Sequence, residues 1–399
     1  MKLKKITCFS AFVFLSTIFT NEIKAQNLTS KQFIEDLEFL KTELPKNHKN
    51  LFFNISEKDF NKKIQEIEKK SNSLNNNNFE IELYKLIKEI GDEHTRIEPL
   101  YEDIFPLHFD FFKEGIFVTE TDSANSDLLY KKLNGIEKQN TKMIIRNFNS
   151  IIKNDNSSYF SVYFQKFINN PKVLNGLNIT KSIDETDYIL DGNKIHITTI
   201  PKENYVSKNE NNLLKYSRKD NYWYQFLNDE KVLYFNYQSC SEEQNYSFKS
   251  FCDKLFNEIE NKKPEKIIID LRNNEGGNSG ILDPFLEKLK NNDLNKKGSL
   301  FVLIGKHTFS SALMNAVDLK RNYHSILIGE STSGNVNHYG ESRGFRLPNS
   351  KIIVGYSTKY WETWKGYKGA LIPDIAIEYS IYNFKNNIDK AIDYVLNYQ

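Results

Sequence analysis

The chain has 399 residues, 39% hydrophobic and 14% aromatic, a composition that excludes intrinsic disorder and suits about two or three globular domains. The formal net charge is only +2, so there is no electrostatic reason to expect nucleic acid or an anionic membrane as a partner.

Residues 1–25 have the pattern of a secretory signal peptide. The basic start MKLKK precedes the apolar run CFSAFVFLSTIF, which is too short to span a bilayer as a stable helix. Ile23 and Ala25 suit the positions before a cleavage site, so Gln26 would begin the mature chain. We therefore expect an exported protein, periplasmic or secreted, with no stable membrane anchor after cleavage; a retained anchor is the alternative.

Residues 26–100 are expected to form a helical domain. Three segments carry apolar residues at helical spacing: SKQFIEDLEFLKTEL, EKDFNKKIQEIEKK and NNFEIELYKLIKEI. Ser30 is a candidate N-cap of the first helix. The asparagine run from Asn75 to Asn78 is interpreted as a solvated linker.

Residues 101–222 are expected to be rich in short strands. The segments LHFDFF, GIFVTE, KKLNGIEK and IRNFNSIIK alternate with turns, and further strands are expected between Leu174 and Ile200. The polar stretch from Lys202 to Asp220 is expected to be a loop.

Residues 223–399 change to a different pattern. The runs VLYFNY, KIIIDL, SLFVLIG and SILIGE are continuously apolar and are separated by helical patterns, which indicates a largely parallel α/β sheet. A hairpin with its turn at Pro348-Asn349-Ser350 and a final helix are expected after them. Cys240 and Cys252 could pair in an exported protein, or could be two buried free thiols.

Two of these strands run through small residues into helices, where backbone N–H groups can hold negative charge. The first carries Gly276 and Gly277 in NNEGGNSG, and the second carries Ser310 and Ser311 in TFSSA. A hydroxyl beside a glycine turn is the minimum needed for acyl transfer. Each motif also has a structural explanation, since the glycines could form a turn without a ligand and serine is a preferred N-cap.

His94 in GDEHT is the candidate general base, because a histidine can exchange protons near neutral pH, and activity should then rise through about pH 6–7. A surface histidine at a helix C-terminus is the alternative. No HExxH pair occurs, and no metal or other cofactor is expected.

The order and spacing of six motifs resemble the tail-specific, or C-terminal processing, serine proteases, particularly the branch similar to the tricorn protease core. The resemblance extends from Gly91 to Ile377 and rests on GDEHT, KIIIDLRNNEGGNSG, TFSSA, LIGESTSGN, LPNS and IPDIAI.

This resemblance implies a crotonase-like α/β peptidase core after a helical amino-terminal part. It implies Ser310 as nucleophile and His94 as base, with an oxyanion hole formed by N–H groups of Gly276, Gly277 and Ser311. Glu93 takes the place of the polar residue before the histidine, and Glu362 that of the distant glutamate that completes a relay.

The chain also departs from the family pattern. Asn335 stands where the processing proteases have a catalytic lysine, and Leu313 where they have a glutamate, so a Ser–Lys dyad is not expected. We assign Asn335 and His338 to substrate binding. Residues 101–222 resemble a reduced PDZ domain, with Lys132-Leu133-Asn134-Gly135 as its most similar stretch.

The sequence therefore predicts an exported serine peptidase acting on peptides or proteins. A catalytically inactive peptide- or ligand-binding protein of the same fold, or an esterase, are the alternatives. Residues 106–200 could gate substrate entry, or could be a packing domain that positions His94.

Overall fold

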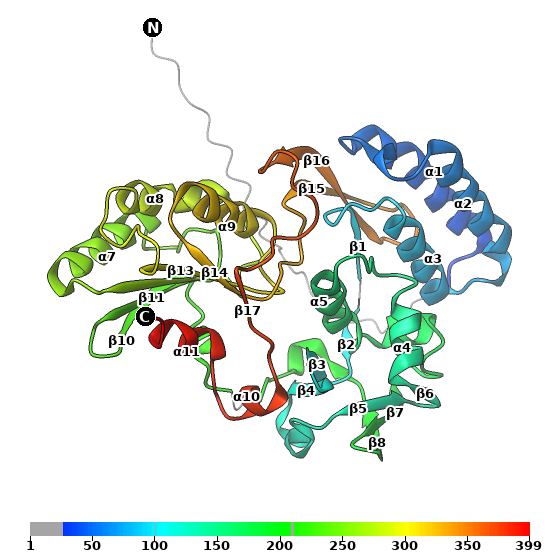
Figure 1. Ribbon diagram of the computed structural model, residues 1–399. Coiled ribbons are helices and arrows are strands. Elements are labelled where there is room, and N and C mark those ends of the chain that lie inside the picture. Colours follow the sequence, from blue (N-terminus) through cyan, green and yellow to red (C-terminus); the bar gives the residue numbers. More distant parts are fainter. Residues whose placement is uncertain (1–26, 100, 209–210) are drawn as a thin grey trace, which may run out of the picture.

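The computed structural model describes residues 27–99, 101–208 and 211–399 (Figure 1). The predicted signal peptide lies outside the described residues. The described part contains no helix long and apolar enough to cross a membrane.

Three helices form the amino-terminal part: α1 (Ser30–Asn47), α2 (Glu57–Lys70) and α3 (Asn76–Lys88). Thr29, and not Ser30, caps α1, because its side chain and that of Gln32 form a reciprocal capping box. The prediction that the asparagine run is a solvated linker is wrong. Asn75 caps α3 by accepting a hydrogen bond from the N–H of Asn78, and the asparagines that follow Asn75 form the first turn of this helix.

The middle segment mixes short strands with helices. Strand β1 (Arg96–Glu98) precedes it, and its own strands are β2 (Asp103–Ile104), β3 (Leu107–Phe112), β4 (Gly115–Thr121), β5 (Leu133–Ile136), β6 (Gln139–Asn140), β7 (Glu185–Leu190), β8 (Asn193–Thr198) and β9 (Ile200–Pro201). Its helices are α4 (Thr141–Phe148), α5 (Ser157–Phe167) and α6 (Pro171–Gly176).

The strand predicted for IRNFNSIIK is therefore wrong. Ile144 and Phe148 are both buried one helical turn apart in α4, and the side chain of Asn140 caps that helix. Helices α5 and α6 were not predicted either. One continuous cluster of buried apolar side chains runs through α1–α3, the middle segment and the hairpin described below.

The carboxyl-terminal half contains a six-stranded sheet in the order β10-β11-β12-β13-β14-β17. The β10–β11 pair is antiparallel and the other pairs are parallel, as the buried apolar runs predicted. The strands are β10 (Tyr222–Leu227), β11 (Val232–Tyr237), β12 (Lys266–Asp270), β13 (Leu300–Ile304), β14 (Ile326–Gly329) and β17 (Ile375–Ala376). The mixed α/β class is confirmed.

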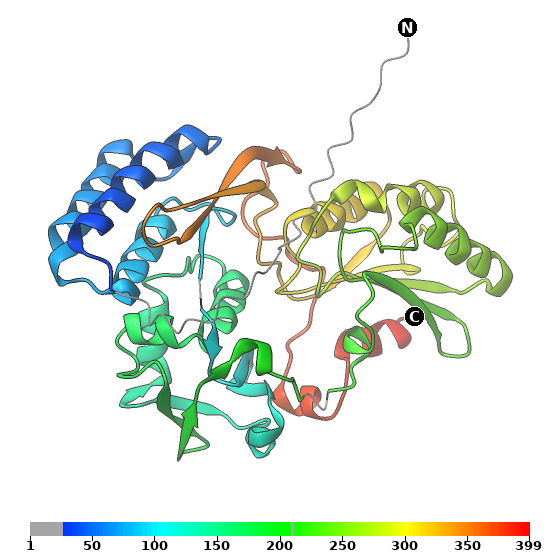
Figure 2. The ribbon, with the colours of Figure 1, turned by 180° about the vertical axis from the view of Figure 1, so that it is seen from behind.

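Helices cover both faces of this sheet (Figures 1 and 2). One face packs against α7 (Phe248–Lys262), α8 (Asp283–Leu289) and α9 (Ser310–Asn322), and the other packs against α11 (Lys390–Leu396). Along β12, Ile267 and Ile269 belong to the first layer and Ile268 to the second, as the alternation of a strand requires.

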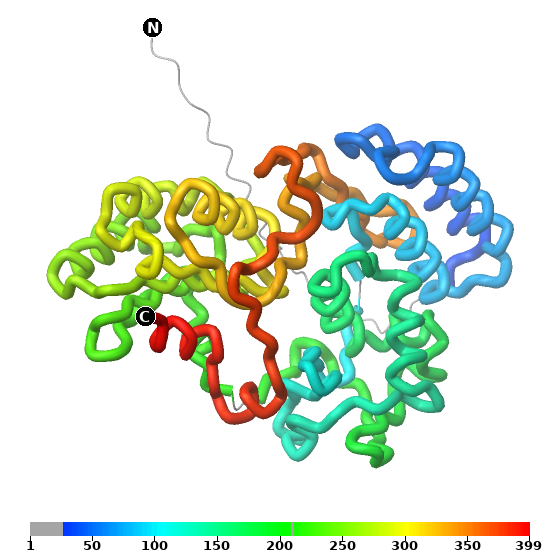
Figure 3. The backbone as a smooth tube through the Cα atoms, viewed as in Figure 1, coloured from blue at the N-terminus to red at the C-terminus, as the bar shows by residue number. Residues whose placement is uncertain are grey.

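A long hairpin of β15 (Asn337–Arg346) and β16 (Ile353–Glu362) joins the two halves of the molecule (Figure 2). Strand β1 pairs with β16, and the backbone N–H of Asn349, in the predicted turn, donates to Asp36 of α1 at 2.7 Å. The chain then passes between the halves through β17 and α10 (Ile381–Lys385) before α11 returns to the sheet (Figure 3). Cys240 and Cys252 are buried free thiols.

Candidate active site

Ser310 occupies a strained position where the loop after β13 enters α9. Its φ is +51°, a left-handed conformation that is costly for a residue with a Cβ. The N-cap of α9 is Phe309, and no side chain caps this helix, so helix capping does not explain the serine. The Ser310 hydroxyl makes no hydrogen bond with the described residues and is half-buried at the wall of a pocket.

The glycine turn lies directly against Ser310. A Cβ on Gly276 would come within 2.8 Å of the Ser310 Cβ and 3.1 Å of the Ser311 nitrogen. Gly276 has φ +111° and Gly277 has φ +134°, conformations open to glycine but not to residues with a side chain. The structure therefore brings together the turn and the serine that the sequence placed in two separate motifs.

The three N–H groups expected to form the oxyanion hole differ in their surroundings. The Gly276 N–H already donates to Asn274 Oδ1 at 2.9 Å. The N–H groups of Gly277 and Ser311 make no hydrogen bond with the described part of the chain, and the Ser311 hydroxyl instead donates to the Gly277 carbonyl at 2.7 Å. Two of the three predicted donors are thus free for a ligand.

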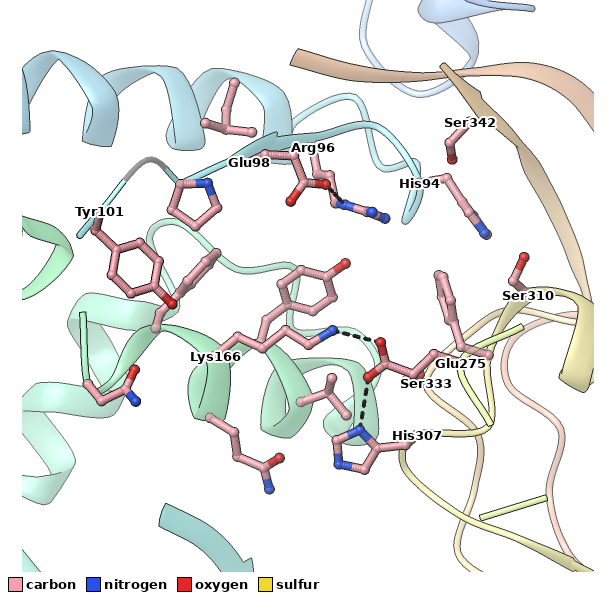
Figure 4. Close-up of a pocket in the computed structure, with 18 of the residues that line it drawn as sticks. His94, Arg96, Glu98, Tyr101, Lys166, Glu275, His307, Ser310, Ser333 and Ser342 are labelled. Atoms are coloured by element: carbon pink, nitrogen blue, oxygen red, sulfur yellow. Dashed lines mark hydrogen bonds and ion pairs between the residues drawn. The ribbon is translucent and has the colours of Figure 1, made fainter. Parts of the chain in front are cut away.

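His94 is buried, and its imidazole faces Ser310 across the pocket (Figure 4). The ring lies between the rings of Phe309, with centroids 4.5 Å apart, and His338, with centroids 5.2 Å apart. Neither ring nitrogen makes a hydrogen bond of ordinary geometry with a described residue. Burial, reinforced by His338, lowers the pKa of His94 to about 3, so the imidazole is neutral at neutral pH.

Asp92 holds the backbone that carries His94. Its Oδ1 accepts the His94 N–H at 3.0 Å, and its Oδ2 accepts hydrogen bonds from His48, Thr95 and Ser357 at 3.1, 2.5 and 2.6 Å. Burial alone would raise the pKa of Asp92, but these donors lower it to about 2. From the sequence, Asp92 and Glu93 beside His94 were expected to hold the imidazole in one tautomer, but Asp92 instead binds the His94 backbone N–H and not its ring. Two of its partners, His48 just after α1 and Ser357 of β16, lie far away in the chain.

Glu93 points to a different neighbour. Its carboxylate accepts the backbone N–H of Asn335 at 3.2 Å and pairs with Lys153 at 3.3 Å. Burial raises the pKa of Glu93 to about 7, although Lys153 opposes that rise. Glu93 thus fixes the loop containing Asn335, and its contacts are those of a positioning residue.

The other two predicted site residues lie on the hairpin. His338 stacks on His94, and its Nδ1 donates to the Asn335 carbonyl at 2.9 Å. Glu362 is exposed and pairs with Asn337 across the hairpin, and the structure shows no contact between its carboxylate and His94. A relay through Glu362 stays a prediction.

A cavity of about 660 Å³ extends from His94 and Ser310 toward the middle segment. Glu275, next to the glycine turn, accepts from His307 at 3.2 Å and pairs with Lys166, which reaches it from α5, at 3.1 Å (Figure 4). The hydrogen bond from His307, followed by the charge of Lys166, lowers the pKa of Glu275 to about 2. No group of three or more histidine, cysteine or acidic side chains is placed to hold a metal ion within the described residues.

Comparison with solved structures finds the same architecture in CPAF. Mature CPAF in complex with lactacystin has a TM-score of 0.63 at 12% identity, over 92% of this chain and 97% of that one. A CPAF mutant gives 0.64 at 11% identity, over 93% and 98% of the two chains. The chain shares the CPAF fold.

The other comparisons give no more specific assignment than this shared fold. The tricorn protease covers 92% of this chain at 12% identity, but only 36% of the tricorn chain is matched and the TM-score is 0.41, so the tricorn-like branch stays a prediction. No protein-family model and no curated protein matches the sequence.

Proposed function

We propose that this protein is a serine peptidase, with Ser310 as nucleophile and His94 as general base. The observation that carries the proposal is the strained Ser310, which lies against a glycine turn and faces a neutral, buried histidine in one pocket. A strained residue of this kind persists only where its surroundings enforce it, and such residues concentrate at active sites.

The chemistry follows from these positions. Ser310 Oγ attacks the scissile carbonyl carbon while a ring nitrogen of His94 takes the hydroxyl proton, and the carbonyl oxygen becomes an oxyanion. The N–H groups of Gly277 and Ser311 stabilise that oxyanion. His94 then gives its proton to the leaving amine as the C–N bond breaks, and a water molecule, deprotonated by His94, releases the acyl group from Ser310.

The remaining site residues support these steps. Gly276 shapes the turn, since its own N–H is engaged by Asn274. Glu93 and Asn335 hold the adjacent loop through their hydrogen bond, and His338 closes the pocket behind His94. Burial keeps His94 neutral, which a proton acceptor requires, but a pKa of about 3 also makes the imidazole a weak base. The proposal therefore requires the pKa of His94 to rise toward neutrality when substrate is bound and the hydroxyl proton is transferred.

The same proposal includes the wider expectations from the sequence. The protein is exported, residues 223–399 form a crotonase-like core related to the tricorn-like branch, and residues 101–222 form a reduced PDZ-like segment beside the pocket. The substrates are peptides or proteins, because the cavity of about 660 Å³ reaches well beyond the serine and histidine.

A catalytically inactive binding protein is the second candidate, and one observation favours it. No carboxylate contacts the ring of His94 within the described residues, whereas a catalytic histidine is commonly oriented by one. In that case the pocket would bind a ligand without turning it over, and lactacystin, which is bound in one CPAF structure, is a suitable first ligand to try.

Hydrolysis assays separate the two candidates. The wild-type protein, Ser310→Ala and His94→Ala are incubated with a peptide library and with a small ester, and products are identified by mass spectrometry. Peptidase activity requires cleavage by the wild type that both variants lose. Cleavage of the ester alone would indicate an esterase, and no cleavage together with retained ligand binding would indicate the inactive protein.

A further inference from the structure

Asn274 lies between the two motifs of the candidate site and is completely buried. Its side-chain Oδ1 accepts the Gly276 N–H at 2.9 Å, and its Nδ2 donates to the Tyr237 carbonyl at 2.8 Å. Its backbone carbonyl accepts the N–H of Phe309, the residue before Ser310, at 3.1 Å. One residue therefore contacts the glycine turn, the end of β11 and the entry to α9.

A second element holds the next peptide of the turn. The Cys240 N–H donates to the Gly276 carbonyl at 3.0 Å, and the Cys240 carbonyl accepts the Asn278 N–H at 2.8 Å. In a planar trans peptide the C=O and N–H point in opposite directions. Because the Gly276 carbonyl points at Cys240, the Gly277 N–H must point away from it.

This geometry explains how a flexible turn can present a fixed donor. Both glycines have positive φ and could adopt other conformations at little cost. Asn274 fixes the peptide before Gly276, and Cys240 fixes the peptide after it. Together they set the direction of the Gly277 N–H, which lacks a hydrogen-bond partner in the described part of the chain.

We infer that Asn274 is a positioning residue for the oxyanion hole: it orients the Gly277 N–H through the turn and at the same time sets the backbone that presents Ser310. Asn274 touches no substrate itself. The inference rests on the proposed function, because it concerns stabilisation of the oxyanion formed when Ser310 attacks.

A positioning role predicts a specific kinetic signature. In Asn274→Ala the turn loses its hydrogen-bond acceptor, and we expect kcat to fall about 10²-fold, approaching the loss of an oxyanion-hole donor, with KM changed by less than about twofold. The affinity for a peptide aldehyde, which forms an oxyanion on Ser310, should fall by a similar factor. The affinity for the corresponding peptide amide should stay unchanged, because the amide does not use the hole.

A further variant keeps the test independent of folding. Asn236→Ala is the matched control, because Asn236 is a buried asparagine at the end of β11 whose side chain donates to the Tyr234 hydroxyl at 3.1 Å and does not contact the turn. It should lower stability without changing the ratio of aldehyde to amide affinity.

The outcomes are distinguishable. If the wild type cleaves peptides and the aldehyde-to-amide ratio of Asn274→Ala equals that of Asn236→Ala, the inference is wrong while the proposed function stands. If the wild type neither cleaves peptides nor binds the aldehyde more tightly than the amide, it is the proposed function that fails.

Discussion

Replacing Asp92 by asparagine should destabilise the protein and also displace His94. Four hydrogen bonds converge on the carboxylate, and the amide of asparagine would place a donor where the wild type has only acceptors. The pKa of Asp92 is lowered from 3.8 to about 2, which corresponds to about 2 kcal/mol of stability from the ionised form. Adding the cost of a buried donor left without an acceptor, about 1–3 kcal/mol, gives an expected loss of about 3–5 kcal/mol.

The sign of the pH dependence makes the prediction sharper. A carboxylate with a lowered pKa stabilises the folded state above the unfolded pKa near 4, and this stability is lost as the pH falls toward 2. Urea unfolding at pH 7 and at lower pH should therefore show a difference between wild type and Asp92→Asn that narrows as the pH falls.

Asp36→Asn is the matched control for activity. Asp36 is also fully buried and accepts backbone N–H groups, those of Asn349 and Ser350, but it lies in α1 away from the pocket. It should lose stability while keeping kcat per folded molecule, whereas Asp92→Asn should lose both. A loss of less than about 1 kcal/mol in Asp92→Asn, or unchanged kcat, would refute the role given to this carboxylate.

Three further predictions follow from the same site. The pKa of His94 is lowered to about 3, which overturns the rise in activity through about pH 6–7 expected from the sequence. In the free enzyme kcat/KM should instead stay level as the pH falls from about 7.5 to 5, and an acid limb near the ordinary histidine value of about 6.5 would show that the ring is not buried there. Gly277→Ala should lower kcat about 10²-fold or more, because the new Cβ would lie 2.4 Å from the Cys240 carbonyl oxygen at φ +134°. Gly192→Ala is the control, since Gly192 has φ +80° and open space around it, and this variant should lose only stability. Equal kcat in the two variants would contradict the role given to the glycine turn. Lys166→Ala removes an exposed ion pair worth less than about 1 kcal/mol, so it should leave the stability of the protein unchanged. It should raise KM for long peptides more than for a small ester, because Lys166 lines the cavity. An equal change in KM for both substrates would mean that α5 only supports the fold and does not contact substrate.

Much of the α/β core could be predicted because its strands are buried on both faces and therefore appear as continuous apolar runs. The middle segment could not be read in the same way. Around Ile144 and Phe148 the apolar residues recur at three- and four-residue spacing, which is the spacing of a helix, and the side chain of Asn140 caps that helix. The strand prediction was wrong there because it took β-branched residues as the signal and overlooked this period.

The candidate site shows a similar division. The motifs around Gly276 and Ser310 predicted two strand-to-helix turns, and the fold brings these turns together at the ends of neighbouring parallel strands β12 and β13. The hydrogen bond of Asn274 with the Gly276 N–H spans only two residues and is of a kind that asparagine commonly forms in turns. The lowered pKa of His94 and the hydrogen bonds of Asp92 with His48 and Ser357, in contrast, depend on residues that meet only after folding. No pattern along the chain encodes those contacts.

The most direct test of the proposed nucleophile is the site of covalent labelling by a fluorophosphonate. Wild type, Ser310→Ala and Ser311→Ala are treated with the probe, and the modified residue is located by peptide mass spectrometry. We predict a single adduct on Ser310 that is lost in Ser310→Ala and retained in Ser311→Ala, whose hydroxyl donates to the Gly277 carbonyl. An adduct on Ser311 or another residue, or no adduct on a folded wild-type protein, would contradict the assignment of Ser310 as the nucleophile.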